Sequence, residues 1–188
     1  MPTLVFGFLI FWAPQLINDA TFHKWLLLLM VFLTTYVIPL LSILMMKLTG
    51  NISSFHMESK DERVFPFSMI SLFYMVVTYF FYLKFQVDPV LILAMASITV
   101  CVILLTSLTF FWKISAHMTG AAGLMGIVAA VSLKYPSYFQ LEALLGSIIL
   151  AGIIGSARLN LNAHRPFEVY FGFLLGFVIC FGTFYFMI

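Results

Sequence analysis

Residues 89–112 read PVLILAMASITVCVILLTSLTFFW and contain no charged side chain. An α-helix needs about 20 predominantly apolar residues to cross the hydrocarbon core of a bilayer. The stretch is long enough for that, and a soluble protein of this size has little use for a helix that is apolar on every side. Residues 89–112 are therefore predicted to be a membrane-spanning helix, and they place the whole chain in the membrane class.

Further apolar runs surround this one. Residues 3–18 are expected to form a tilted or partly interfacial helix, because the run is short and contains Pro14 and Gln15. It has no basic flank and no small-residue cleavage site, so we expect it to belong to the mature protein rather than to a signal peptide. Pro39 is expected to kink the second run. The remaining predicted spans are 25–46, 66–83, 118–133, 139–156 and 166–187. The expected fold is all-α, a polytopic transmembrane bundle of six to seven helices that forms one domain over residues 1–188.

The composition supports the same class. Of the 188 residues, 63% are hydrophobic and only 9% are charged, whereas a soluble domain carries about a quarter charged residues. The net charge of +2 is too small for a surface that tracks nucleic acid. These values exclude a cytosolic globular enzyme, a disordered chain and a nucleic-acid binder. The cysteines, Cys101 and Cys180, both lie inside apolar runs, so no disulfide framework is expected.

Nearly every charged side chain falls in a break between two apolar runs, as expected from the cost of a charge in lipid. Successive spans alternate in direction, so successive breaks alternate between the two membrane faces. The second, fourth and sixth breaks therefore share one face, which we call the motif face. It is predicted to hold Lys60, Arg63, Lys113, Ser115, His117, Arg158, His164 and Glu168. The opposite face is predicted to hold Lys24, Lys84 and Lys134.

The last break is the most informative segment. Residues 157–168 read ARLNLNAHRPFE. On a helix His164 and Glu168 would share one face, because they are four residues apart, and Pro166 suits the first turn of a helix. Glu168 is then placed to accept a hydrogen bond from one ring nitrogen of His164. This hydrogen bond would leave the other ring nitrogen free to attack an electrophile.

Two earlier segments add polar groups to the same face. Residues 113–120 read KISAHMTG and precede a run rich in small residues. Ser115 or a neighbour is expected to cap the helix that follows and to present backbone N–H groups to a phosphate. Residues 60–66 read KDERVFP and supply Lys60 and Arg63 just before a span. Four glycines of the later spans are predicted to mark close helix packing, namely Gly152, Gly155, Gly172 and Gly176.

Together the three segments resemble the signature of the type 2 phosphatidic acid phosphatase superfamily, which reads K-x6-R-P, P-S-G-H and S-R-x5-H-x3-D. The third motif matches in spacing at Arg158, His164 and Glu168, with Glu in place of Asp. The second matches at Ser115 and His117. The first departs from the pattern, since Lys60 is separated from Arg63 by two residues rather than six.

The resemblance implies a metal-independent and cofactor-independent phosphatase that acts through a phosphohistidine. By analogy His164 is the nucleophile, Glu168 orients it, and His117 is the general acid and later the base. The phosphoryl oxygens would be bound by Arg158, Lys60, Arg63, Ser115 and Lys113. A site at the membrane boundary would take a lipid headgroup while the tail stays in the bilayer. The candidate substrates are phosphatidic acid, phosphatidylglycerol phosphate and a polyprenyl diphosphate.

Two other functions fit the same residues. The loose first motif is compatible with a non-catalytic relative that binds anionic headgroups, and the same chemistry would serve a lipid phosphotransferase. Lys113 and Arg158 also fit a purely structural role, in which cations anchor the ends of helices at the lipid headgroups. The oligomeric state stays open.

The orientation follows from the positive charges only in part. The motif face carries six Lys or Arg side chains against three on the other face, which favours a cytoplasmic site. Four of the six cations on the motif face are assigned to phosphate binding, namely Lys60, Arg63, Lys113 and Arg158. Without them the motif face carries two Lys or Arg side chains and the opposite face carries three. Members of the resembled family commonly place the site outside. We therefore expect a plasma (inner) membrane protein with its active site on the outer face.

Overall fold

The computed structural model describes residues 1–17, 23–50, 61–83 and 87–188, and the backbone alone at residues 61, 62, 138 and 139. Lys60, one of the predicted phosphate ligands, lies outside the described residues. The described chain is an all-α bundle, which confirms the expected fold class.

Six helices are long and apolar enough to cross a membrane within the described ranges. The first of them is continuous over Lys24–Leu48 and consists of α2 (Lys24–Phe32), a π-helical segment η2 (Leu33–Val37) and α3 (Ile38–Leu48). The other five are α4 (Asp61–Leu83), α5 (Pro89–Thr109), α6 (Ala116–Lys134), α7 (Tyr138–Asn160) and α8 (Pro166–Met187). A short helix α1 (Pro2–Trp12) and a 3-10 turn η1 (Pro14–Leu16) precede them.

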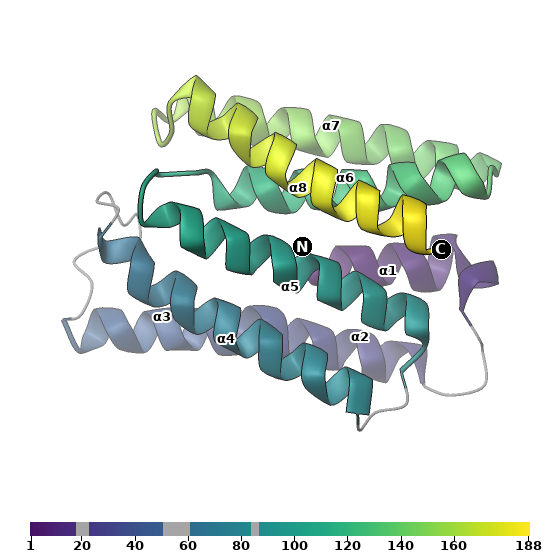
Figure 1. The fold of residues 1–188 in the computed structure, drawn as a ribbon, viewed down its shortest axis with the longest axis horizontal. Helices are drawn as coiled ribbons and strands as arrows, with labels where there is room; N and C mark the ends of the chain where they lie inside the picture. The colour runs from purple at the N-terminus through teal and green to yellow at the C-terminus, as the bar shows by residue number, and fades with distance from the viewer. Residues whose placement is uncertain (18–22, 51–60, 84–86) are drawn as a thin grey trace.

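The long helices run roughly parallel to one axis of the molecule, and their ends gather at its two extremities (Figure 1). At one extremity α3 ends and α4 begins, α5 passes into α6, and α7 turns into α8. The opposite extremity holds the junctions between α4 and α5 and between α6 and α7. The alternation predicted from the sequence is therefore confirmed, and we call the first extremity the motif end.

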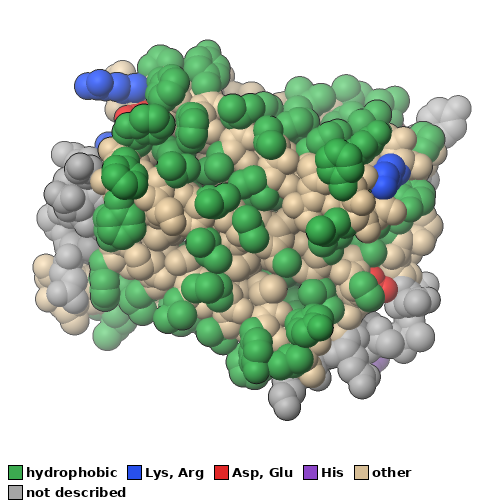
Figure 2. Space-filling model, viewed as in Figure 1, with side chains coloured by type: hydrophobic (Ala, Val, Ile, Leu, Met, Phe, Trp, Pro, Cys, Tyr) green, Lys and Arg blue, Asp and Glu red, His purple; other side chains and the backbone are tan. Residues whose placement is uncertain are grey.

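Figure 2 shows hydrophobic side chains over the middle of the visible face and charged side chains near its two ends. This is the surface expected of a protein that lies in lipid over its middle and meets water at both ends. The chain is an integral membrane protein.

The N-terminal run differs from its prediction. Helix α1 has 11 residues, about 16 Å at the usual rise per residue, and a span requires about 30 Å. Its side chains Val5, Phe6 and Leu9 are almost completely buried, and the helix starts in the middle of the bundle (Figure 1). It is thus an internal element rather than an interfacial one. Pro14 ends it, because a residue before proline is held away from helical geometry.

Pro39 marks the expected irregularity in the first long helix. Proline has no N–H, so it leaves the carbonyl oxygen of Thr35 without its helical donor. The helix widens into the π-helical segment just before this point, and the hydroxyl of Tyr74 from α4 donates a hydrogen bond of 3.2 Å to the Thr35 oxygen. The polar gap left by proline is therefore filled by a neighbouring helix, as the bilayer requires.

Helices α6 and α8 form the most extensive helix pair of the bundle, and glycines bring their backbones together. A Cβ atom at Gly172 would lie 2.9 Å from the carbonyl oxygen of Ser115, and one at Gly176 would collide with the carbonyl oxygen of Thr119. These two glycines confirm the packing prediction. Gly152 does not, because it faces open space on α7.

The close contact predicts that Gly176→Ala destabilises the bundle by about 1–3 kcal/mol, the usual cost of overpacking. Gly182→Ala is the matched control, since it lies on the same helix and a Cβ there meets nothing within 4 Å. Unfolding midpoints of both variants in detergent measure the difference. Equal midpoints would show that α6 and α8 are not held at this distance.

Candidate functional site

The predicted site residues that the structure describes all lie at the motif end. Lys113 and Ser115 lead into α6, and His117 is on its first turn. Arg158 is in the last turn of α7 and Glu168 is in the first turn of α8. His164 lies in the turn between α7 and α8. Arg63 is on the first turn of α4, which begins at Asp61 and not at residue 66 as expected. Arg63 is therefore a helix residue, and it is only 9% exposed.

The turn between α7 and α8 fixes the spacing between Arg158 and His164. The N–H of Ala163 donates to the carbonyl oxygen of Arg158, and the N–H of Asn162 donates to that of Leu159. These two bonds form a Schellman motif, which requires a left-handed residue after the helix. Asn162 takes that conformation with φ of 49°, and asparagine tolerates it better than most residues. Sequence reasoning missed this role, although an Asn shortly before a proline is a helix-stop signal.

His164 is held by two acceptors on the same ring nitrogen. Its Nδ1 lies 3.0 Å from Oε2 of Glu168 and 3.0 Å from the backbone oxygen of Lys113. A carbonyl oxygen can only accept, so Nδ1 must carry the hydrogen. In the neutral ring Nε2 then carries a lone pair and no proton. The expected pairing of His164 with Glu168 is present, and the Lys113 carbonyl is a second partner that no side-chain pattern could have revealed.

Glu168 also has a structural role. Its Oε2 accepts the backbone N–H of Arg165 at 3.1 Å, which is the N-terminal capping interaction expected of a Glu at the third position of a helix. Its carbonyl oxygen accepts the N–H of Ser115 at 3.3 Å. The bonds from His164 to Lys113 and from Ser115 to Glu168 thus tie the second motif segment to the third.

Ser115 caps α6, as expected, because its Oγ accepts the N–H of Met118 at 3.4 Å. The residue has no exposed surface. The structure thus shows the capping role of Ser115, and its predicted contact with phosphate stays a prediction.

Positive side chains act electrostatically on both histidines. Arg63 and Arg158 both lie within electrostatic reach of His117, and so does His164. Arg63 also lies within reach of His164. The alternation of spans predicted that these side chains share one membrane face. In the structure, side chains from α4, α6, α7 and the α7–α8 turn interact electrostatically there. Together these groups can bind an anion and can move a proton at two imidazoles.

Burial lowers the pKa of His164 below its ordinary value of 6.5, and the positive charge of Arg63 acts in the same direction. The hydrogen bonds to Glu168 and to the Lys113 carbonyl oppose this shift without cancelling it. The side chain of His164 is only 5% exposed. His164 is therefore a mainly neutral imidazole at pH 7, which is the form that a nucleophile requires.

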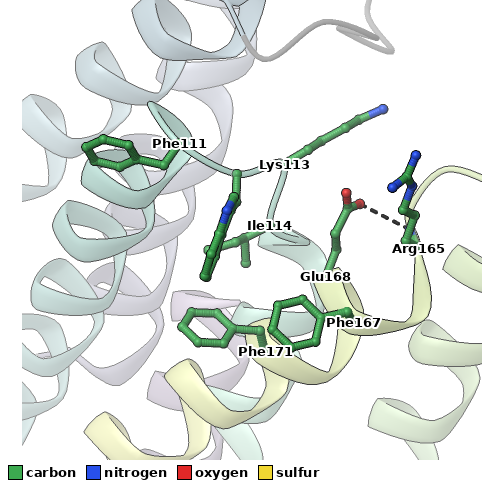
Figure 3. Close-up of a pocket in the computed structure, with 8 residues that line it drawn as sticks. Phe111, Lys113, Ile114, Arg165, Phe167, Glu168 and Phe171 are labelled. Carbon is green, nitrogen blue, oxygen red and sulfur yellow. Dashed lines mark hydrogen bonds between the residues drawn. The ribbon is translucent and has the colours of Figure 1, made fainter.

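Lys113, Arg165 and Glu168 line a hollow of about 420 Å³, whose lining residues are drawn in Figure 3. Lys113 and Arg165 extend on either side of the Glu168 carboxylate, above the rings of Phe167 and Phe171. Trp112 packs edge-to-face on both rings, with centroid distances of 5.9 and 5.6 Å. Aromatic rings below cations are typical of the membrane–water boundary. This position suits the helix-anchoring role of Lys113, while its contact with phosphate stays a prediction.

Each histidine also lines a hollow of its own. His164 lines one of about 610 Å³ with Asn162 and Pro166 at the α7–α8 turn. His117 lines another, of about 340 Å³, that extends into the bundle. The two histidines thus line different hollows, and they interact electrostatically.

No protein-family model, curated protein or solved structure matches the chain. The resemblance to the type 2 phosphatidic acid phosphatase superfamily therefore rests on the motif residues and their spacing, and the activity that it implies is a proposal.

The double hydrogen bond predicts a measurable response to Glu168→Gln. The amide oxygen of glutamine can still accept from Nδ1 and from Arg165, but the negative charge that favours the imidazolium is lost. We therefore expect the pKa of His164 to fall further below 6.5. Histidine-selective NMR titration in detergent measures it, with the signal assigned from His164→Ala. Glu142→Gln, on α7, is the charge-matched control and should leave the pKa of His164 unchanged. A rise in that pKa in the Glu168 variant would contradict the arrangement.

Proposed function

We propose that the chain is an integral membrane phosphatase that removes phosphate from a lipid phosphate or diphosphate through a phosphohistidine. The single observation that carries the proposal is the hydrogen bonding of His164. Both acceptors engage Nδ1, so Nε2 is unprotonated, and the positive charge of Arg63 acts on the ring. A neutral, oriented imidazole next to cations is suited to attack on an anionic phosphorus centre.

The reaction has two steps. In the first, Nε2 of His164 attacks phosphorus, the bond from phosphorus to the lipid oxygen breaks, and His117 donates a proton to the departing oxygen. In the second, His117 takes a proton from water, the resulting hydroxide attacks phosphorus, and the phosphorus–nitrogen bond breaks. Inorganic phosphate leaves and both histidines return to their starting state. Glu168 and the Lys113 carbonyl stabilise the positive charge that His164 carries between the steps.

The cations neutralise the phosphoryl oxygens in this mechanism. Among the described residues Arg63 and Arg158 are suited to it, because Arg63 acts electrostatically on both histidines and Arg158 acts on His117. Lys60 is proposed from its place in the first motif. Such a reaction depends mainly on positioning and on stabilisation of charge.

The membrane places limits on the substrate. The site lies at the end of the bundle, next to the aromatic rings of the boundary, so a headgroup can reach it while the tail stays in apolar surroundings. Phosphatidic acid, phosphatidylglycerol phosphate and a polyprenyl diphosphate all meet this requirement. We propose the outer face of the plasma (inner) membrane as its location.

A second candidate is a protein that binds anionic lipid headgroups without turnover. One observation favours it. Glu168 and Ser115 each have a complete structural role as caps, so their presence does not require catalysis.

Phosphate release decides between the two candidates. We expect His164→Ala to lower the release of phosphate from lipid phosphates in detergent by about a thousandfold or more, as the loss of a covalent nucleophile does elsewhere. His23→Ala makes the same substitution at the opposite end of the bundle and should keep full activity. Full activity in His164→Ala would remove the nucleophile assignment. Lipid binding without release in the unmodified protein would favour the second candidate.

The pH dependence gives an independent test. The attacking form of His164 is neutral, and its pKa lies below 6.5. Activity should therefore rise with pH along an acidic limb whose midpoint is below 6.5. A phosphate monoester itself titrates at about pH 6, so we compare the unmodified protein with Glu168→Gln on the same substrate. The variant should move the limb in kcat/KM to lower pH. An unmoved limb would show that His164 does not set it.

A further inference from the structure

A cavity of about 340 Å³ runs from His117 into the interior of the bundle. Its walls come from α1, η2, α4, α5, α6 and α8. Along α6 it extends from His117 to Leu124, and along α5 from Leu105 to Ile98. Seven residues of helix correspond to about 10 Å, so the cavity reaches well below the membrane boundary.

The walls of this cavity are mainly apolar, apart from Met1, whose N-terminal amine acts electrostatically on His117. Several polar side chains lie in them, but their hydroxyl groups are already bonded to backbone oxygens. Tyr74 donates to Thr35, Thr35 donates to Val31, and Thr119 donates to Ser115. The thiols of Cys101 and Cys180 contact each other at 3.7 Å. A ligand inside this cavity is therefore recognised by its apolar surface.

The charge distribution is one-sided. His117 stands at the motif end of the cavity, and Arg63, Arg158, His164 and the N-terminal amine of Met1 act on it electrostatically. An occupant with an anionic head and an apolar tail matches this arrangement, because the head meets the cations while the tail lies among Val102, Leu105 and their neighbours. A neutral hydrocarbon would match the apolar walls, but it has no negative charge to interact with the positive groups near His117.

The size limits the occupant further. A water molecule occupies about 30 Å³ in the liquid, and a methylene group is of similar size. The cavity therefore holds about eleven such groups, which is one medium-length chain and not two. Tyr36, which also lines the cavity, is 55% exposed, so the cavity also borders the lipid-facing surface.

From these observations we infer that the cavity takes one hydrocarbon chain of the lipid phosphate, of about eleven carbons within the bundle, with the phosphate at His117. The inference rests on the proposed function for the identity of the headgroup. A second chain, where the lipid has one, stays in the bilayer.

Photolabelling tests the site without any requirement for turnover. The probe is an undecyl phosphonate with a diazirine at the end of its chain, whose carbon–phosphorus bond is not hydrolysed. In the unmodified protein we expect labels on residues deep in the cavity, such as Cys101, Val102 or Leu124. The same chain with an uncharged alcohol head should label them at least about tenfold less. Labels confined to the outer side of α5, at Val100 and Leu104, would overturn the inference.

A pair of variants tests the same site by kinetics. Val102→Trp fills the cavity, whereas Val100→Trp adds the same side chain to the lipid-facing side of α5, where Val100 is 46% exposed. We expect Val102→Trp to lower kcat/KM for undecyl phosphate by at least about tenfold, because a displaced phosphate no longer meets the histidines. Val100→Trp should change it by less than twofold. Unfolding midpoints check that both variants fold, and equal kinetics in two folded variants would overturn the inference.

The outcomes separate this inference from the proposed function. Release of phosphate without labels in the cavity would overturn the inference and leave the phosphatase in place. Labels in the cavity that Val102→Trp abolishes, with no release from any lipid phosphate, would support the inference and end the phosphatase proposal.

Discussion

The close approach of α6 to α8 is the contact on which the candidate site depends. Gly172 and Gly176 let the backbone of α8 lie against the carbonyl oxygens of Ser115 and Thr119. Only at this distance can the N–H of Ser115 reach the carbonyl of Glu168, and His164 reach the carbonyl of Lys113. A pair of methyl groups between these helices would separate the two motif segments. The orientation of the imidazole is thus a consequence of helix packing in the first turns of α6 and α8.

The apolar interior of the bilayer explains how the other polar groups are arranged. A bilayer offers no water to unpaired backbone groups, so each irregularity must be satisfied by the protein. The hydroxyl of Tyr74 fills the gap left by Pro39, and the Schellman bonds close the end of α7. Charged groups are kept to the ends of the helices for the same reason. A reactive cluster at one end next to an apolar cavity therefore suits a substrate with a charged head and a hydrocarbon tail.

Most of the fold could be predicted from the sequence, because the cost of charge in lipid marks where spans begin and end. The predicted spans and their alternation are confirmed from α2 to α8. The exceptions have local causes. Pro14 ends α1 early and leaves it inside the bundle. Helix α4 begins at Asp61, so Pro66 lies inside the helix and does not mark its start. Gly152 could not be told from Gly172 by sequence, since the difference is only whether another helix lies against the glycine.

The candidate site divides in a similar way. Hydropathy and spacing were sufficient to place five site residues at one end of the bundle, namely Arg63, His117, Arg158, His164 and Glu168. A chain that crosses a bilayer repeatedly can place its loops only on the two membrane faces, so alternate loops share a face. Tertiary structure alone decided that Ser115 is buried, that the Lys113 carbonyl holds His164, and that a cavity adjoins His117. Those features depend on backbone atoms and on empty volume between helices. The identity of no single residue reveals these backbone contacts or this cavity, because both form only when segments distant in the sequence pack together.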